Sequence, residues 1–343
     1  MTSPDLPANP PTLHDVAREA GVSLATASRS LNGSARTVRE PYREKVLAAA
    51  ARLGYTPNLS AQAVAKGSTM TVALLVADIA DPYFSSIAAG VIRAADDVGL
   101  VVTMAATERD TRRELELVRA MRGQRPRVLI LAGSRVEGDE NELALRAELE
   151  AFQSTGGRVT LISQNTLPFE TVLLDNFEGA RALAASLVEL GYRRFAAISG
   201  VASLRTARDR LTGFRAGLAD HGIDLSDDDV AVTAFTRDGG YAGAEQLIPR
   251  ITDFDLVFAV NDVMAVGAMS ALRDAGIAPG VDVGVAGYDD IPTVRDVTPA
   301  LTTVRIPLEE VGARALALAM GTGEQSAPIA TEVILRASTP RRG

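Results

Sequence analysis

Residues 12–33 of the chain read TLHDVAREAGVSLATASRSLNG. Thr12 and Asp15 have the spacing of a capping box, in which the two side chains accept hydrogen bonds from each other's backbone N–H groups. This pair predicts a helix that begins at Leu13 and runs to about Ala20.

A second short helix follows after a tight turn. Gly21 stops the first helix, because glycine adopts left-handed backbone angles at little cost. Ser23 is a suitable N-cap, so we expect the second helix over residues 24–31. Two short helices joined by so tight a turn predict a helix-turn-helix unit.

A third helix is predicted over residues 41–53, which completes a head domain over residues 12–57. A second capping box, formed by Thr37 and Glu40, leaves an earlier start of this helix open. Residues 58–69 are rich in alanine and small polar side chains, but an isolated helix of that length is marginal in water. We expect this segment to be a hinge that folds only when something docks against it.

From Thr71 onward, short apolar strands alternate with amphipathic helices. This alternation predicts parallel sheets with right-handed crossovers. About ten strands exceed one comfortable sheet, so the fold class is an all-α head followed by an α/β body of two doubly wound lobes, with a ligand crevice at the carboxyl ends of the strands. The expected strands are residues 72–77, 100–105, 128–131, 159–163, 195–199, 256–260 and 283–287, and the expected helices include residues 84–98, 112–122, 179–190, 208–221 and 262–275.

The net charge of −8 conceals opposite charges on the two parts of the chain. Residues 1–66 carry eight Lys and Arg and five acidic residues, a net charge of +3, which leaves −11 for the remainder. A basic head on an acidic body directs one end of the molecule toward phosphate. The chain has no cysteine and no apolar run of membrane-spanning length, and residues 1–11 carry four prolines and no secretory signal. We therefore expect a cytoplasmic protein, associated with the nucleoid, with a disordered arm over residues 1–11.

The opening stretch closely resembles the head of the lactose- and purine-repressor (LacI/GalR) family of bacterial transcriptional regulators, and the match continues over nearly the whole chain. The resemblance implies a repressor that binds near-palindromic operator DNA as a homodimer and is controlled by a small effector. It also implies a body like that of periplasmic binding proteins over residues 70–340, with one lobe over about 70–174 and 306–329 and the other over about 175–305 and 330–340. The further matching motifs are REKV at 43–46, LGYTPN at 53–58, AQAVA at 61–65, DPYF at 81–84, DNFEG at 175–179, RLTGF at 210–214, ND at 261–262, GYDD at 287–290 and LTT at 301–303.

In a helix-turn-helix the second helix enters the major groove of DNA. The resemblance implies that Leu24, Ala25 and Arg29 read bases: the guanidinium suits a guanine, and the two apolar side chains suit thymine methyl groups. The alternative is that Leu24 belongs to the core and Arg29 is a solvated charge. The other expected DNA contacts, suited mainly to phosphate, are His14, Ser23, Thr26, Ser28, Asn32 and Asn58.

Val64 stands where the family usually has the leucine that wedges into the minor groove. Valine is shorter and β-branched, so we expect weaker kinking of the DNA, unless Val64 only packs against its symmetry mate. No leucine-heptad extension follows the body, which favours a dimer over a coiled-coil tetramer.

The resemblance places the effector between the two lobes. Arg210 and Asp289 match charged ligand contacts and can grip adjacent sugar hydroxyls, or they pair with each other instead. Asn261 and Asp262 begin a helix after a strand and can also reach a ligand, although Asp262 is equally suited to cap that helix. The remaining candidates are Thr206 and the rings of Tyr83, Phe84 and Phe235, which cover the apolar face of a ligand or belong to the ordinary core.

Two departures bear on the effector. Ser163 and Gln164 stand where many sugar-binding relatives have Asp-Arg, and Leu204 stands where purine-binding relatives have an arginine. A sugar or polyol is the first expectation and a nucleoside or purine the second. The two histidines lie in no triad or metal-ligand spacing, so we expect no enzyme activity, no cofactor and no metal. A sugar-binding transport protein is the alternative class, which the DNA-binding head opposes.

Overall fold

The computed structural model describes residues 11–32, 38–56, 69–323 and 328–342. It divides into two compact units, residues 1–69 and 70–343, which we describe separately. The predicted arm at residues 1–10, the capping box at Thr37, Asn58, Val64 and the side chain of Asn32 lie outside the described part.

The head is a bundle of three short helices, as predicted. The capping box of Thr12 and Asp15 is present at the start of the first helix, and Gly21 has a φ of +63° after it. The backbone N–H of Thr26 donates to Ser23 Oγ at 3.1 Å, which makes Ser23 the cap of the second helix. The third helix begins one residue before the predicted Pro41, because this proline occupies the first turn, where its missing N–H costs nothing. The helices are α1 (Leu13–Glu19), α2 (Leu24–Asn32) and α3 (Glu40–Leu53).

The first lobe of the body is a five-stranded parallel sheet covered on both faces. The strand order is β2-β1-β3-β4-β5. Alternate residues of β1 point to opposite faces: Leu74 packs toward α5 and α12, whereas Leu75 packs toward α6 and α7. The elements are β1 (Thr71–Val76), α5 (Pro82–Asp97), β2 (Val101–Ala106), α6 (Thr111–Gly123), β3 (Val128–Ala132), α7 (Glu142–Ser154), β4 (Arg158–Ser163), β5 (Glu170–Leu173) and α12 (Leu308–Met320).

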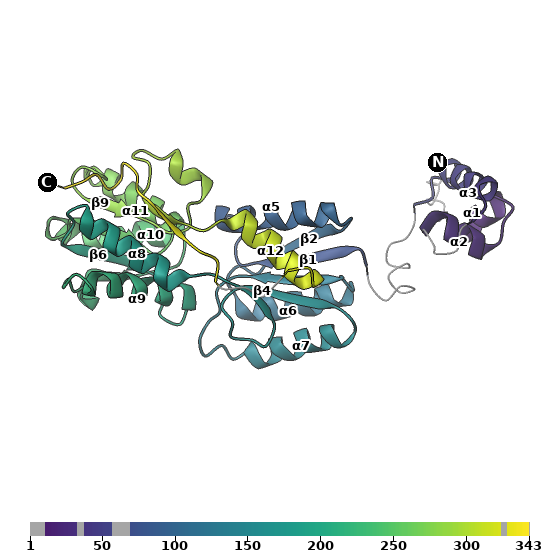
Figure 1. Ribbon diagram of the computed structural model, residues 1–343, viewed down its shortest axis with the longest axis horizontal. Coiled ribbons are helices and arrows are strands. Elements are labelled where there is room, and N and C mark those ends of the chain that lie inside the picture. The colour runs from purple at the N-terminus through teal and green to yellow at the C-terminus, as the bar shows by residue number, and fades with distance from the viewer. Residues whose placement is uncertain (1–10, 33–37, 57–68, 324–327, 343) are drawn as a thin grey trace, which may run out of the picture. The chain divides into compact units, whose positions relative to one another are not determined.

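The second lobe repeats this plan with a four-stranded parallel sheet in the order β7-β6-β8-β9. Helix α8 packs on α9, and α10 packs on α11 (Figure 1). A short antiparallel pair, β10 with β11, runs beside this lobe. The elements are α8 (Asn176–Glu189), β6 (Phe195–Ser199), α9 (Arg205–Ala219), β7 (Val230–Val232), α10 (Arg237–Leu247), β8 (Leu256–Ala259), α11 (Asp262–Asp274), β9 (Gly284–Ala286), β10 (Thr303–Arg305) and β11 (Glu332–Ile334), with 3-10 turns η1 (Asp227–Asp229), η2 (Ile248–Asp253) and η3 (Pro292–Arg295).

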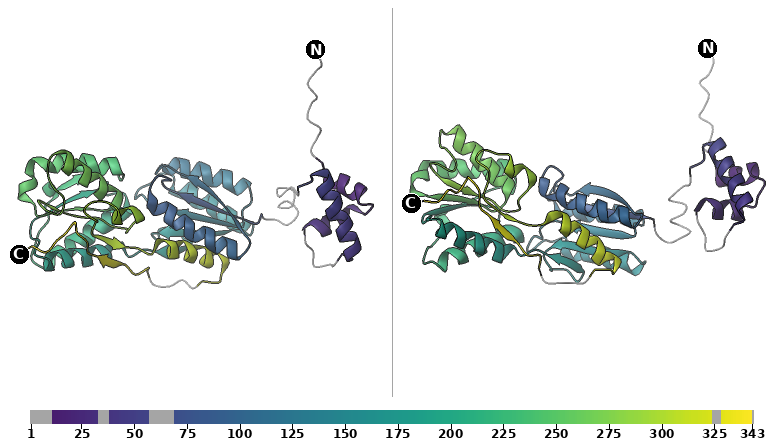
Figure 2. Two further views of the ribbon diagram at one scale, coloured as in Figure 1. Left: turned by 90° about the horizontal axis from the view of Figure 1, so that it is seen from above. Right: turned by 45° about the horizontal axis from the view of Figure 1, so that its top comes forward.

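The chain passes between the lobes three times: after β5, after β10 and after α12. Both views in Figure 2 show the two lobes next to each other, with the yellow C-terminal part of the chain running between them. The fold class predicted from the sequence is therefore confirmed. No helix in the described part of the chain is long and apolar enough to cross a membrane.

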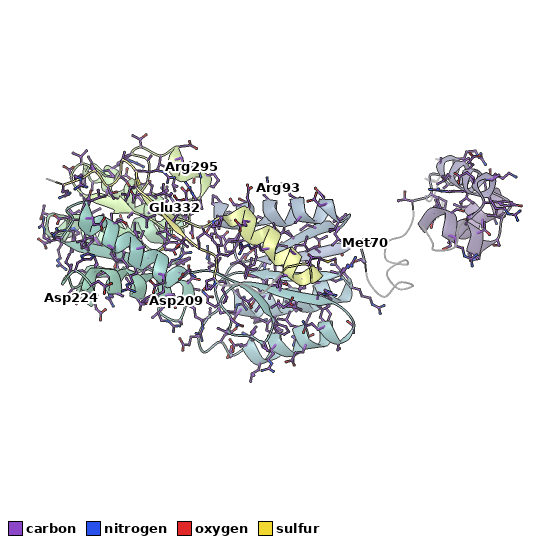
Figure 3. The ribbon with its side chains drawn as sticks, in the orientation of Figure 1. Met70, Arg93, Asp209, Asp224, Arg295 and Glu332 are labelled. Carbon is purple, nitrogen blue, oxygen red and sulfur yellow. The ribbon has the colours of Figure 1, made fainter. Side chains whose placement is uncertain are left out.

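Helices α5 and α12 approach each other so closely that only glycine fits at the crossing. A Cβ at Gly90 would lie 1.9 Å from the carbonyl oxygen of Glu309, and one at Gly312 would lie 2.1 Å from that of Ile87. An ion pair between Arg93, labelled in Figure 3, and Glu309 spans the same two helices.

We predict that Gly90→Ala lowers the free energy of unfolding by about 2–4 kcal/mol, because backbone must move in a packed interior. Urea denaturation measures this change. Gly123→Ala, near the end of α6 with open space around it, is the control and should be neutral or slightly stabilising. Equal stability of the Gly90 variant and the wild type would contradict the close approach.

Candidate functional site

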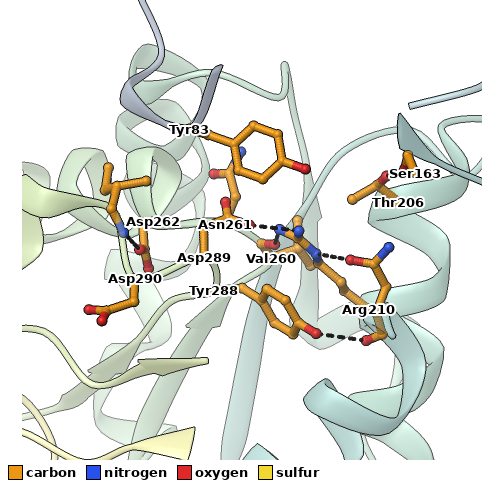
Figure 4. Close-up of polar contacts among 12 residues, drawn as sticks. Tyr83, Ser163, Thr206, Arg210, Val260, Asn261, Asp262, Tyr288, Asp289 and Asp290 are labelled. Atoms are coloured by element: carbon orange, nitrogen blue, oxygen red, sulfur yellow. Dashed lines mark hydrogen bonds and ion pairs between the residues drawn. The ribbon is translucent and has the colours of Figure 1, made fainter. Parts of the chain in front are cut away.

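A polar pocket lies between the two lobes, at the carboxyl ends of their strands. Its walls follow β1, β2, β3 and β4 of the first lobe and β8 and β9 of the second, as expected for doubly wound sheets. All seven residues predicted to contact an effector line it, and several are shown in Figure 4. The lining residues are Asp81, Tyr83, Phe84, Arg109, Gly133, Ser134, Ser163, Thr206, Arg210, Phe235, Asn261 and Asp289.

Arg210 is the most completely tethered of these side chains. It is 2% exposed. Its Nη2 donates to Asp289 Oδ1 at 2.7 Å, its Nε to Asn176 Oδ1 at 2.9 Å, and its Nη1 to the carbonyl oxygen of Val260 at 2.9 Å. Its guanidinium also lies over the ring of Tyr288, 4.0 Å from the centroid. Of the two alternatives left open by the sequence, the structure shows that Arg210 and Asp289 pair with each other while both face the pocket.

Asp262 has neither of the two roles considered for it. Asn261 caps α11 by accepting from the N–H of Met264 at 2.9 Å, and Asp262 does not line the pocket. The carboxyl group of Asp262 is fully buried and bonds the N–H of Ile291 at 2.9 Å and the hydroxyl of Thr303 at 2.6 Å. The carboxyl group of Asp262 thus ties the start of α11 to the turn after β9 and to β10.

The aromatic side chains combine the two roles that the sequence left open. Phe84 is 5% exposed and belongs to the core, yet it also lines the pocket. Tyr83 and Phe235 are partly buried against the core and reach the pocket from opposite lobes.

Gln164 connects the two lobes. Its Nε2 donates to Thr206 Oγ1 at 2.8 Å, and its Oε1 accepts from the N–H of Arg135 at 3.1 Å. The N–H of Thr206 also donates to Ser134 Oγ at 3.0 Å. The lobes are therefore joined here by neutral hydrogen bonds.

Strained backbone is concentrated around the pocket. Ser163 and Asp289 have φ values of +130° and +124°, and Arg109 and Asp290 have φ values of +60° and +55°. Each such residue costs about 1–3 kcal/mol, and this strain typically marks functional sites. It holds these side chains at the carboxyl ends of β2, β4 and β9.

Sequence reasoning missed five lining residues as ligand contacts: Asp81, Arg109, Gly133, Ser134 and Ser163. Their positions in the sequence could have identified them, because each lies at or shortly after the carboxyl end of a strand of the first lobe. No cluster of His, Asp and Glu in the described residues is able to hold a metal ion.

In the head, most residues predicted to contact DNA face solvent. Leu24 is 39% exposed, so it is not core. His14, Ala25 and Arg29 are exposed, whereas Ala27 and Ser30 form the buried side of α2. The remaining predicted contacts in the described part are Ser23, which is exposed, and Thr26 and Ser28, which are partly exposed.

Comparison with known proteins agrees with this architecture. The family model of bacterial regulatory proteins of the lacI family matches residues 12–58, and that of the periplasmic binding protein-like domain matches residues 184–341. The HTH-type transcriptional regulator DegA of Bacillus subtilis is 31% identical over 88% of this chain and 88% of its own length. The chain belongs to the LacI/GalR family of transcriptional regulators. It is a DNA-binding regulator, and its relatives are regulators rather than enzymes.

Two solved structures of family members match almost the full length. The lac repressor dimer bound to operator and the anti-inducer ONPF has a TM-score of 0.82 at 28% identity, covering 97% of this chain and all of that chain. The complex of the transcriptional regulator CelR with cellobiose has a TM-score of 0.68 at 31% identity, covering 96% and 99%.

Burial raises the pKa of Asp262 to about 7, and the nearby charge of Asp290 acts in the same direction. The folded protein therefore holds a proton that the unfolded chain, with a carboxyl pKa of about 3.9, releases. This contribution to stability is complete below pH ~4 and is lost as the pH rises through about 7.

We predict that Asp262→Asn removes this pH dependence, which is on the order of 4 kcal/mol at most. The amide can donate to Thr303 and accept from Ile291, so it replaces the protonated acid. Urea unfolding between pH 4 and 8 compares the variant with the wild type, and Asp224→Asn on the surface (Figure 3) is the control. Parallel stability profiles of the Asp262 variant and the wild type would show that this carboxyl group stays ionised.

Proposed function

We propose that the protein is a repressor that binds a near-palindromic operator as a homodimer and responds to a neutral sugar or polyol bound between its lobes. The observation that carries the effector proposal is the composition of the pocket. Its acidic and basic side chains are equal in number, Asp81 and Asp289 against Arg109 and Arg210. A charged ligand would upset this balance, whereas a polyhydroxyl compound would not.

The rest of the pocket suits the same ligand class. Ser134, Ser163 and Thr206 offer hydroxyl groups, and Phe84 and Phe235 offer rings for the apolar face of a sugar. The CelR relative, whose structure contains cellobiose, supports this class. A nucleoside or purine corepressor is less well supported, because Leu204 supplies no charged or hydrogen-bonding group.

The head supports the DNA-binding half of the proposal. Leu24, Ala25 and Arg29 lie on the exposed side of α2, where a recognition helix presents its base contacts. The related lac repressor is bound to operator as a dimer. Reading DNA places the protein in the cytoplasm, at the nucleoid, and argues against a transport protein.

We predict that Arg29→Ala weakens operator binding by about 1–3 kcal/mol at one guanine position in each half-site. Site selection from random duplexes identifies the operator, and titrations on operator and random DNA measure the loss. Arg18→Ala, on α1, serves as the control for removal of one positive charge. An equal loss on both kinds of DNA would reduce Arg29 to a phosphate contact, and no preferred palindrome at all would refute the proposed function.

The first lobe offers a surface for the second subunit. Strand β2 is the edge of its sheet, so one side of its backbone is unpaired. Exposed apolar side chains surround this edge: Ile92 and Val98 are 44% and 49% exposed, and Val101 and Met104 are 63% and 41% exposed. Such a patch on a sheet edge favours association with a second copy of the chain.

We predict that Met104→Lys shifts the protein from dimer to monomer, because a charge placed in an apolar interface loses its hydration. Light scattering coupled to size exclusion measures the mass. Leu143→Lys, at a side chain that is 80% exposed on α7, should leave the dimer intact. Unchanged mass of the Met104 variant would place the interface elsewhere.

A further inference from the structure

Arg109 occupies the space between the aromatic rings of the pocket. Its Cζ lies 5.8 Å from the ring centroid of Phe84, in the first lobe, and 5.4 Å from that of Phe235, in the second. Both distances are within the range of cation–π attraction, which extends to about 6 Å. The guanidinium thus contacts the two rings that suit the apolar face of a sugar.

The enclosed space left beside Arg109 is small. It amounts to about 30 Å³, within a pocket that opens to solvent and has about 370 Å³ of empty space when that solvent is included. The enclosed part accommodates about two water molecules, whereas a hexose has about a dozen non-hydrogen atoms. For a sugar of this size to lie between the two rings, the guanidinium of Arg109 must leave the space that it occupies there.

Arg109 is the lining side chain best placed to leave. Arg210 is 2% exposed and makes hydrogen bonds through Nε, Nη1 and Nη2. Apart from the two rings, Arg109 is held only through Nη2, at 3.2 Å from Asp81 and 3.5 Å from Asp78. Its Nε is buried and has no hydrogen-bond partner among the described residues. Its backbone is in the left-handed region together with that of Glu108, with φ values of +60° and +57°. An unpaired buried donor on a strained backbone makes this position costly.

A second cavity next to the pocket can receive the side chain of Arg109. This cavity has a volume of about 40 Å³ and shares Arg109, Gly133 and Ser134 with the pocket. Asp110, Glu114 and Arg135 also line it, and Glu114 is paired with Arg135, so a guanidinium that swings there meets the carboxylate of Asp110 beside an existing ion pair. The same movement vacates the gap between Phe84 and Phe235.

We propose that Arg109 is a built-in occupant of the effector pocket, which competes with the effector for the faces of Phe84 and Phe235 and must be displaced for binding. This inference rests on the proposed effector function of the pocket. Arg109 lowers the apparent affinity by the fraction of molecules in which it is withdrawn. It also restricts binding to ligands whose contacts with the pocket offset the free energy of moving Arg109 away from the rings. Arg109 is therefore a residue that determines specificity.

The first test needs no ligand. The chain has no tryptophan, so Phe235→Trp introduces a single fluorescent indole beside Arg109. Adding Arg109→Ala to this full-length protein should shift the indole emission to the red and increase its quenching by acrylamide, because water replaces the guanidinium. Adding Arg146→Ala, at an exposed side chain on α7 paired with Glu150, should change neither. Unchanged emission and quenching in the Arg109 variant would overturn the proposal.

The second test uses D-glucose, D-galactose and cellobiose as calorimetric probes of the full-length protein. Arg109→Ala and Arg109→Met should bind a responding sugar about three- to tenfold more tightly than the wild type, since the competing side chain is gone. Arg146→Ala should bind as the wild type does. Weaker binding in both Arg109 variants would make Arg109 a contact that recognises the effector and would overturn the proposal.

The two proposals fail in different ways. If no probe binds to any variant, these sugars are excluded as effectors, and the quenching experiment still decides whether Arg109 covers Phe235. If Arg109→Ala unfolds in a thermal melt, both measurements are made on Arg109→Met, which keeps the unbranched stem of the side chain and removes the guanidinium.

Discussion

The structure of the body depends on one buried charge. The guanidinium of Arg210 is shielded from water, and a charge in that position is tolerated only when it is paired and hydrogen-bonded. Its partners come from the start of α8, the end of β8 and the turn after β9. Separating one of these elements from the guanidinium would leave a buried charge without a partner, at a cost of about 3–5 kcal/mol, so the contacts hold the three elements together at this wall of the pocket.

The first lobe is attached to that wall by more exposed contacts. A partly exposed ion pair joins Glu137 to Arg208 across the boundary. Gln164, Ser134 and Thr206 add neutral hydrogen bonds, each worth about 1 kcal/mol net because water offers similar partners. Contacts of this kind exchange with ligand hydroxyls or with water at little cost. A ligand can change the angle between two lobes when one wall of its pocket is rigid and the contacts between the lobes can be replaced by contacts with the ligand. The proposed control by an effector requires such a difference between the two walls.

The sequence predicted the parts of this design that depend on local signals. The caps of α1 and α2, the glycine turn between them and the seven predicted strands appear within a few residues of their predicted positions, because capping and hydrophobic periodicity are local properties. The short edge strands β5 and β7 were not predicted. The seven residues placed together in the pocket were found through the family resemblance. Arg109 was missed because the neighbouring sequence contains no glycine or other signal that predicts two consecutive residues with positive φ. The role of Asp262 was missed because its partners lie 29 and 41 residues further along the chain. The choice between pairing and ligand binding for Arg210 and Asp289 also required coordinates, since both alternatives use the same residues.

The same buried charge limits which ligands the pocket accepts. An anionic ligand would have to draw Arg210 away from Asp289, whose carboxylate is 5% exposed and would be left without a partner. Breaking a buried pair in this way costs about 3–5 kcal/mol, most of which is the desolvation of the abandoned charge. A cationic ligand faces the converse problem with Asp289 and Arg210. A neutral polyol would leave the pair intact and add hydrogen bonds around it, so the proposed preference for neutral ligands follows from the fold of the second lobe.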